Sequence, residues 1–248
     1  MALYVGLSGF SYKEWQGEGR FYPADLKAKD FFKFYADNFN TVEMDSTWYR
    51  MPPENGVNNW VKQAPPGFKY TFKMHRDVSH LRRLKPESIE SVKFFIKRLK
   101  PALDAGQVGC VYVQLPPNMK RSDERLISFL EELPMKAEGS EVIVPWGIEW
   151  RNESWDHDEI ASLMAAKNIA YVASDNDETR GVMRDTGSVI YARMRREEYS
   201  DNELKLWADW FNKGLAAGKD VYAMFKHEDD GSPWLDAWRL LEIMGQRK

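Results

Sequence analysis

The sequence has a single cysteine, Cys110, which excludes an intramolecular disulfide and a metal site built from several cysteines. No apolar run approaches the roughly 18 residues of a membrane-spanning helix. Residues 1–9 have neither the basic start nor the long apolar core of a signal peptide. The net charge is only −3, so nucleic-acid binding would depend on a local basic patch rather than on the chain as a whole. We therefore expect a cytoplasmic protein with no membrane segment.

Strand-like apolar segments alternate with helical patterns along the chain, in a composition of 43% hydrophobic and 29% charged residues that is ordinary for a globular protein. The expected strands are 3–8, 41–45, 69–75, 109–114, 146–151, 169–175, 189–193 and 221–226. The expected helices are 28–38, 54–63, 87–104, 122–133, 156–167, 201–217 and 233–244. No linker or repeat interrupts them. The pattern predicts one α/β domain over residues 1–248, a (β/α)8 TIM-like barrel with a closed parallel sheet; an open doubly wound sheet is the alternative.

Barrel enzymes carry their sites at the C-terminal ends of the strands, and side chains alternate between the two faces of each strand. This alternation predicts a polar ring at one end of the barrel. Its expected members are Glu43, Asp45, Lys73, Gln114, Glu149, Arg151, Asp175, Arg193 and Lys226. The acids and bases of such a ring neutralise one another, which makes their burial tolerable. One interpretation is an ion-pair plug of purely structural value. We favour a functional pocket, because buried ion pairs stabilise little more than an apolar filling of equal volume.

Several motifs resemble those of a known family. They are 6–12 (GLSGFSY) with Trp15, 21–23 (FYP), 42–49 (VEMDSTWY), 66–68 (PGF) with Phe72 and Lys73, 114–117 (QLPP), 149–151 (EWR) with Ser154 and Trp155, and 191–193 (YAR). In this order they resemble the YecE-like family (domain of unknown function seventy-two). The resemblance implies a TIM-like barrel and brings no established reaction. The chain departs from the family pattern at Met194-Arg195-Arg196 and at Lys226-His227, so its last two loops are expected to bind a different ligand or to bind it differently.

Four carboxylates of the ring are candidate catalytic residues: Glu43, Glu149, Asp45 and Asp175. Carboxylates in one pocket can divide into a proton donor and an acceptor when their environments differ, and Glu43 and Glu149 are the first candidates. The alternative for each is that it only anchors a neighbouring arginine. Lys73 as a Schiff-base nucleophile is disfavoured, because an adjacent acid would hold it charged.

The basic and aromatic residues of the ring are candidate substrate-binding residues. Lys73, Arg151, Arg193 and Lys226, together with Gln114, suit a phosphate or carboxylate, and Tyr12, Trp15 and Tyr49 suit a sugar ring or base. Packing of these aromatic residues against the barrel rim is the alternative. Only His75 and His227 among the histidines lie near strand ends, and neither belongs to a spacing-defined metal motif. Any metal held mainly by the carboxylates would be Mg²⁺ or Mn²⁺ rather than Zn²⁺. We therefore predict no cofactor and no resident metal.

One basic segment, residues 73–85, borders the expected pocket. It contains Lys73, His75, Arg76, His80, Arg82, Arg83 and Lys85, and Arg195 and Arg196 could extend it. Three functions follow. We favour an enzyme that uses carboxylate acid–base chemistry on a small anionic or sugar-containing molecule. The alternatives are a nucleic-acid-binding or nucleic-acid-processing protein that uses this segment, and a binding barrel without catalysis.

Overall fold

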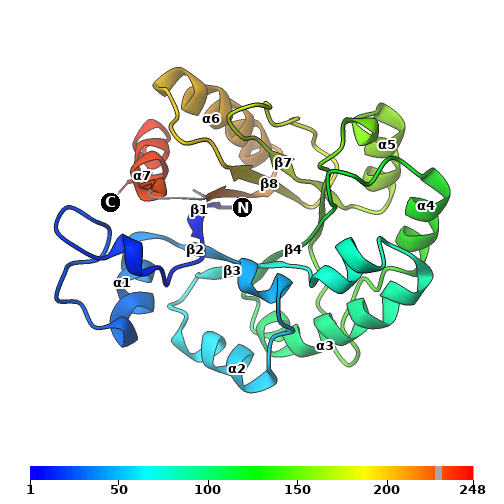
Figure 1. Ribbon diagram of the computed structural model, residues 1–248, viewed down its shortest axis with the longest axis horizontal. Helices are drawn as coiled ribbons and strands as arrows, with labels where there is room; N and C mark the ends of the chain where they lie inside the picture. The colour runs from blue at the N-terminus through cyan, green and yellow to red at the C-terminus, as the bar shows by residue number, and fades with distance from the viewer. Residues whose placement is uncertain (227–230, 248) are drawn as a thin grey trace.

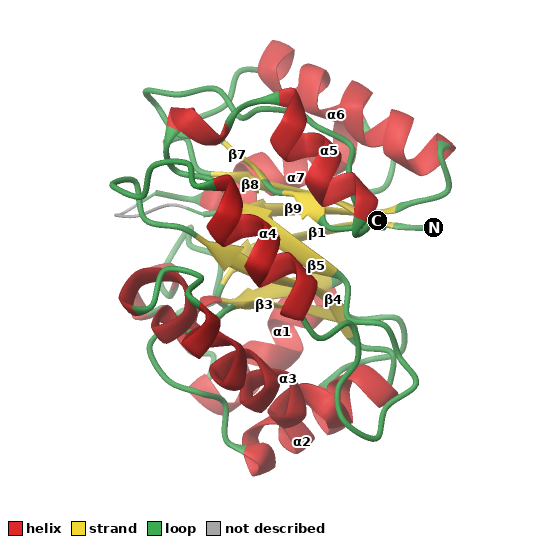
Figure 2. Cartoon of the chain, turned by 90° about the vertical axis from the view of Figure 1, so that its right-hand side faces the viewer, coloured by secondary structure: helices red, strands yellow, loops and turns green. Residues whose placement is uncertain are grey.

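The computed structural model describes residues 1–226 and 231–247 and shows parallel strands ringed by helices (Figure 1). The strands are β1 (Leu3–Ser8), β2 (Thr41–Met44), β3 (Lys69–Lys73), β4 (Val108–Gln114), β5 (Trp146–Glu149), β6 (Ala170–Tyr171), β7 (Ala173–Ser174), β8 (Val189–Met194) and β9 (Asp220–Phe225). The helices are α1 (Phe31–Asn38), α2 (Glu54–Gln63), α3 (Ile89–Asp104), α4 (Asp123–Glu132), α5 (Asp158–Ala166), α6 (Asp201–Ala216) and α7 (Pro233–Ile243). Both termini lie at one end of the barrel (Figure 2), and the loops that follow the strands lie at the other.

The strand order is β6-β5-β4-β3-β2-β1-β9-β8-β7, and every pair in it is parallel. The chain passes from β6 to β7 through Val172 alone, and this continuity completes the ring. The predicted TIM-like barrel is confirmed. The predicted sixth strand, 169–175, is instead two strands of two residues each.

The sixth strand is split because its backbone changes partner. The Val172 amide donates to the Ile148 carbonyl in β5 at 2.9 Å, whereas the Asp175 amide donates to the Arg193 carbonyl in β8 at 3.2 Å. The inward face changes with it: Val172 packs inside the barrel, and Ala173 packs in the outer core. The expectation that Asp175 points into the barrel is therefore wrong.

Tyrosines fill much of the barrel interior. The buried interior cluster consists of Tyr4, Cys110, Tyr112, Ala170, Val172, Val189, Tyr191, Tyr222 and Met224. Tyr4 and Tyr222 stack with ring centroids 4.8 Å apart, and Tyr112 and Tyr191 lie 5.4 Å apart. Burial raises the pKa of the Cys110 thiol, so this cysteine is an inert packing residue. These side chains fill the barrel interior toward the N-terminal ends of the strands. Any ligand would therefore have to bind at the C-terminal ends.

The outer core between strands and helices holds most of the other aromatic residues. Trp15 is buried there, with its ring 5.7 Å from Trp234 at the start of α7. Helix α6 starts with a capping box, in which the side chains of Ser200 and Glu203 each accept a hydrogen bond from the other's backbone amide. No helix in residues 1–226 and 231–247 is both long and apolar enough to cross a membrane.

Candidate functional site

Three charged side chains meet across the barrel interior: Glu43 from β2, Glu149 from β5 and Arg193 from β8. Nε of Arg193 donates to Oε2 of Glu43 at 2.9 Å, and its Nη2 donates to Oε1 at 2.8 Å. Its Nη1 donates to Oε2 of Glu149 at 2.8 Å. The arginine side chain is 1% exposed and both carboxylates are 0% exposed. We call these residues the Arg193 triad; alternation along the strands brings them together as predicted.

The two triad carboxylates have further donors. Ser8 and Tyr191 donate to Glu43, and Gln114 and Arg151 donate to Glu149. Burial would raise the pKa of Glu43, but the charge of Arg193 and these hydrogen bonds outweigh it and lower the pKa to about 2. Burial is likewise outweighed at Glu149, where Arg193 and Arg151 lower the pKa to about 2. Carboxyls with such pKa values donate no proton near neutral pH, and their contacts favour the anchoring alternative for both.

Asp45 and Lys73 lie one step nearer the C-terminal ends of β2 and β3. Burial raises the pKa of Asp45, the charge of Glu43 raises it further, and Lys226 opposes both. Nζ of Lys226 lies 3.8 Å from Oδ2 of Asp45, and the two side chains are 24% and 21% exposed. Asp45 therefore differs sharply from Glu43, although the two stand on one strand face.

Lys73 has a lowered pKa. Burial lowers it from 10.5 to about 8, the charge of Arg193 lowers it as well, and Glu149 and Glu43 oppose the shift. Its Nζ lies 5.1 Å from the centre of the Trp48 ring. Within the described part of the chain, no carboxylate forms a salt bridge with this ammonium. Desolvation thus makes Lys73 a weaker base than an ordinary lysine, so that it loses its proton near pH 8 instead of above pH 10.

The three predicted aromatic binding residues behave differently from one another. Tyr12 is half-buried, and its hydroxyl has a pKa raised by burial and then by the charge of Asp45, so it lies at the same end of the barrel as that carboxylate. Tyr49 is 69% exposed and packs its edge against Trp48, with ring centroids 4.6 Å apart. Trp15 is buried in the outer core, so its aromatic ring serves packing.

Asp175 is not brought to the Arg193 triad. Its Oδ1 accepts the Tyr199 hydroxyl at 2.5 Å and the Arg195 amide at 3.0 Å, and its Oδ2 accepts Nε of Arg196 at 3.3 Å. Burial raises its pKa, and these hydrogen bonds oppose the shift. The carboxylate therefore fixes the backbone that follows β8. Sequence alternation missed this because it assumed an unbroken sixth strand.

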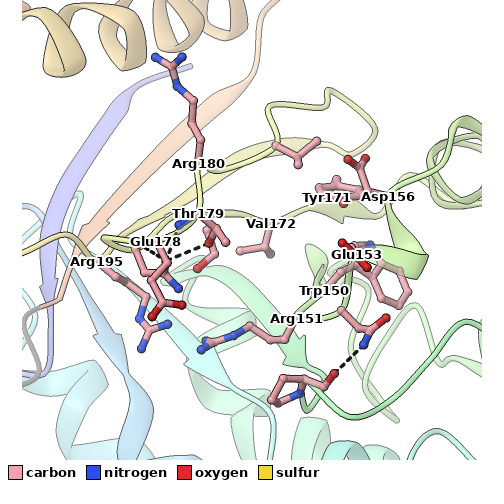
Figure 3. Close-up of a pocket in the computed structure, with 15 residues that line it drawn as sticks. Trp150, Arg151, Glu153, Asp156, Tyr171, Val172, Glu178, Thr179, Arg180 and Arg195 are labelled. Carbon is pink, nitrogen blue, oxygen red and sulfur yellow. Dashed lines mark hydrogen bonds between the residues drawn. The ribbon is translucent and has the colours of Figure 1, made fainter.

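A cavity of about 430 Å³ lies beside the split strand (Figure 3). Its lining is Pro117, Trp150, Arg151, Asn152, Glu153, Asp156, Tyr171, Val172, Ser174, Asn176, Glu178, Thr179, Arg180, Val182 and Arg195. Arg151 connects it to the triad, because its Nη1 donates to Oε1 of Glu149 at 3.1 Å. Of these residues, the sequence pointed to a binding role only for Arg151 and Arg195, while Pro117 and Trp150 were noted only as parts of family motifs. Asn176, Glu178, Thr179, Arg180 and Val182 lie in the loop after the split strand, and a continuous apolar run gives no signal of such a split.

Comparison with known proteins agrees with this architecture. The family model described as "Protein of unknown function DUF72" matches residues 4–248. The chain belongs to the DUF72 family. The resemblance seen in the motifs is thereby confirmed, over nearly the whole sequence.

Curated relatives and solved structures of DUF72 proteins extend the comparison. The chain is 22% identical to UPF0759 protein YunF of Bacillus subtilis (strain 168), over 98% of this chain and 94% of that protein. It is 30% identical to UPF0759 protein YecE of Escherichia coli (strain K12), over 53% and 44%. A DUF72 family protein from Thermotoga maritima MSB8 superposes with a TM-score of 0.80 at 24% identity, over 99% of this chain and 100% of that one. One from Enterococcus faecalis V583 gives 0.77 at 18% identity, over 98% and 95%. These structures show the same fold.

The departure at Met194-Arg195-Arg196 has a structural consequence in this DUF72 chain. Arg196 pairs with Asp175 and, through Nη1, with Glu203 of α6 at 3.0 Å. Arg195 lines the cavity instead. The second departure includes Lys226, which pairs with Asp45, and His227, which lies outside the described residues.

The basic segment 73–85 satisfies part of its charge within the chain. Arg82 forms a 2.9 Å salt bridge with Asp77, and Nη2 of Arg83 donates to Asn118 at 3.1 Å. Nδ1 of His75 accepts the Asp77 amide at 3.2 Å. Across residues 1–226 and 231–247, no group of three or more His, Cys, Asp or Glu residues is placed to hold a metal ion.

Proposed function

We propose that this DUF72 protein is an enzyme that moves protons with Asp45 and Lys73 on a small anionic or sugar-containing molecule. The observation that carries the proposal is the environment of these two groups. Burial raises the pKa of one and lowers that of the other to about 8, and both lie at the C-terminal ends of neighbouring strands. General acid–base catalysis needs groups whose pKa values lie near the working pH, and barrel enzymes hold them at this end.

The Arg193 triad supports this pair in the proposal. Its net charge is negative, with two carboxylates around one guanidinium, and it lies beneath the two proton-carrying groups. Glu43 raises the pKa of Asp45, and Arg193 lowers that of Lys73. The triad thus sets the protonation of the reacting groups without exchanging protons itself. Gln114 acts with it by donating to Glu149 at 2.8 Å.

In this proposal, the remaining charged and aromatic side chains at the C-terminal ends of the strands bind the substrate. Lys226 and Arg151 are partly exposed cations, with side chains 24% and 26% exposed. They suit the phosphate or carboxylate of a substrate, and Tyr12 and Tyr49 suit its ring. The nucleic-acid alternative stays a prediction. We favour the small molecule because Arg82 and Arg83 of the basic segment already bind Asp77 and Asn118.

The test is exchange of carbon-bound protons for deuterium, followed by NMR. The full-length protein is incubated in D2O with a panel of sugar phosphates and sugar acids. The variants Lys73→Met and Asp45→Asn should slow the exchange about 10²-fold or more. The matched controls Lys33→Met and Asp37→Asn, an exposed pair on α1, should leave it unchanged. Exchange at the wild-type rate in both Lys73→Met and Asp45→Asn would contradict the proposal.

A further inference from the structure

We propose that Trp48, Lys73, Arg76 and His80 form the subsite that binds a phosphate monoester group of the substrate. We call these four residues the Trp48 cluster. The inference rests on the proposed function, since it names the charged group of a substrate that binds at the same barrel end. The cluster comes from the C-terminal ends of β2 and β3 and from the segments that follow them, and these two strands are neighbours in the sheet (Figure 1).

Three nitrogen-bearing side chains surround the indole of Trp48. Nζ of Lys73 lies 5.1 Å from the centre of this ring, and Cζ of Arg76 lies 5.9 Å from it. The His80 ring meets the indole nearly at a right angle, with ring centroids 5.0 Å apart. Attraction between each cation and the indole face keeps the two charges beside one ring. The indole thus gathers a lysine, an arginine and a histidine around itself.

A shared hydroxyl fixes Trp48 beside β3. Trp48 ends a 3₁₀-helix, Asp45–Trp48, that directly follows β2. Oγ1 of Thr47 in this helix lies 2.6 Å from the Lys73 carbonyl oxygen and 2.7 Å from that of Met44, and it donates its proton between them. The loop after β2 is therefore tied to the end of β3, and the position of the indole over Lys73 is set by the backbone.

The turn that carries His80 is unusual and firmly anchored. Residues Asp77–Leu81 form a π-helix, and Arg83 and Leu84 after it have φ angles of 52° and 59°. Residues other than glycine seldom adopt this left-handed region, and they keep it only where the surrounding structure enforces it. Val78 and Leu84, both 0% exposed, anchor the turn in the outer core. Such π-turns occur frequently at functional sites.

The two cations of the Trp48 cluster keep their hydrogen-bond donors for a ligand. Among the residues that the structure describes, neither Lys73 nor Arg76 forms a salt bridge, and their contacts with the indole use no N–H group. Arg82 of the same basic segment differs, since it forms a 2.9 Å salt bridge with Asp77. An ammonium group has three donors and a guanidinium has five. Lys73 and Arg76 can therefore bind several oxygens of one anion.

His80 offers a third group to the ligand. Its Nδ1 lies 2.8 Å from Oγ of Ser79, so Nε2 is the ring nitrogen left to face a ligand. Burial lowers the pKa of His80, and the positive charges of Lys73, Arg83 and Arg151 lower it further. The charges that act on this imidazole are therefore all positive, and a bound anion would offset them.

The charge of the Trp48 cluster favours a phosphate monoester over other anions. A monoester carries about −1.5 to −2 charge near pH 7 and three acceptor oxygens, which matches the two cations and the imidazole. A carboxylate or a phosphate diester carries a single negative charge and would neutralise only one of the cations. Nucleic-acid backbones consist of diesters, and binding them depends on several cations along the chain. The small phosphorylated molecule is therefore the better match.

NMR titration of the full-length protein tests the proposal. The probes are methyl phosphate, a monoester; dimethyl phosphate, a diester like those of nucleic acids; and acetate. The ¹H–¹⁵N signal of the Trp48 indole, identified by its loss in Trp48→Phe, should shift and saturate with methyl phosphate at pH 7.5. Dimethyl phosphate and acetate should bind about tenfold more weakly or less. The proposal is overturned if methyl phosphate does not bind, or if acetate or dimethyl phosphate binds as tightly; equal binding of dimethyl phosphate would favour the nucleic-acid alternative.

Three variants locate the bound phosphate. Arg76→Met should weaken binding of methyl phosphate about tenfold or more, because it removes charge-assisted hydrogen bonds. His80→Asn keeps a group that can bond to Ser79 but removes Nε2, and it should weaken binding about threefold or more. The matched control Lys85→Met removes the same charge from an exposed position of the same segment and should not change the affinity. Melting curves check that each variant is folded. Wild-type affinity in both Arg76→Met and His80→Asn overturns the subsite.

Lys73 gives a second, independent measure of where the phosphate lies. The charged side chains that act on it in the free protein stay in place in the complex: Arg193, Glu149, Glu43 and Lys226. A negative group bound beside the ammonium favours its charged form, so saturating methyl phosphate should raise the pKa of Lys73 above about 8. NMR of the ¹³C-methylated protein measures this. A pKa of Lys73 that methyl phosphate leaves unchanged would mean that the phosphate binds elsewhere.

These outcomes separate the inference from the proposed function, because binding of methyl phosphate is measured without turnover. If methyl phosphate binds as described while Lys73→Met and Asp45→Asn exchange protons at the wild-type rate, the subsite stands and the proton-transfer pair is wrong. If methyl phosphate fails to bind while these two variants lose exchange, the pair stands and the subsite is overturned.

Discussion

Arg193 binds Glu43 along one whole edge of its guanidinium, with Nε 2.9 Å from Oε2 and Nη2 2.8 Å from Oε1. The same guanidinium reaches across the barrel to Glu149 through Nη1 at 2.8 Å. Two strands far apart in the sheet are thus tied to β8 by one side chain. Removing water from such charges is costly, so loss of one partner leaves the others buried and uncompensated.

Replacement of Arg193 should destabilise the fold strongly. Arg193→Met keeps an apolar stem but leaves Glu43 and Glu149 as two buried carboxylates, and we expect a loss of about 3–5 kcal/mol in the free energy of unfolding. Urea denaturation measures it. The control Lys33→Met removes an exposed pair with Asp37 and should change stability by less than about 0.5 kcal/mol. Equal losses in the two variants would show that the triad contributes nothing special.

The same carboxylates predict how stability depends on acid. The pKa of Glu43 and that of Glu149 are lowered from 4.5 to about 2 in the folded protein. Below 4.5 the unfolded chain therefore binds more protons than the folded one. Their stabilising contribution is complete above pH 4.5 and is lost as pH falls toward 2. Denaturation at pH 6, 4.5 and 3 should show this fall, and Glu43→Gln should flatten it. A variant with the wild-type slope would rule out Glu43 as its source.

The barrel and the triad could be predicted because both depend on simple periodicities. The alternation of strand and helix patterns along the chain predicted the fold. The alternation of side chains within each strand placed Glu43, Glu149 and Arg193 on the inner face. The split sixth strand could not be predicted, because exchanging neighbours at Val172 changes hydrogen bonds without changing residue types. Asp175 was misplaced for this reason alone.

The roles within the ring were harder to predict than its membership. Glu43 and Asp45 share a strand face, yet one is buried against Arg193 and the other is partly exposed beside Lys226. Their pKa values shift in opposite directions: burial raises that of Asp45, whereas at Glu43 the charge of Arg193 on a distant strand outweighs burial and lowers it, and no local pattern reports either cause. Trp15 presents the same difficulty: an aromatic residue in a loop has the same sequence signature whether it faces a ligand or, as here, Trp234.

Lys73 should titrate far below an ordinary lysine. Reductive ¹³C-methylation followed by NMR should show one lysine with a pKa about 8, absent from Lys73→Met. Because its folded pKa is below 10.5, the unfolded chain binds the proton more tightly, and Lys73 costs stability at neutral pH. Lys73→Met should therefore be at least as stable as wild type at pH 7, with the difference shrinking as pH rises from about 8 to 10.5. A pKa near 10.5 for Lys73 would contradict the environment described for it.

The pH dependence of proton exchange should assign the reacting groups. With Asp45 as base and Lys73 as acid, activity rises as Asp45 loses its proton and falls above about pH 8 as Lys73 loses its own. Asp45→Asn should remove the acidic limb of this profile and lower the maximum about 10²-fold. Lys73→Met should remove the alkaline limb.

Glu43→Gln is the discriminating comparison. The Glu43 carboxylate stays charged down to a pKa about 2, so its removal should lower stability and shift both limbs while keeping each of them. A positioning residue changes the pKa values of its neighbours, whereas a proton-carrying residue takes its limb away when it is replaced. A Glu43→Gln profile without an acidic limb, beside an Asp45→Asn profile that keeps it, would make Glu43 the base. The raised pKa of Asp45 would then reflect only its burial beside that carboxylate.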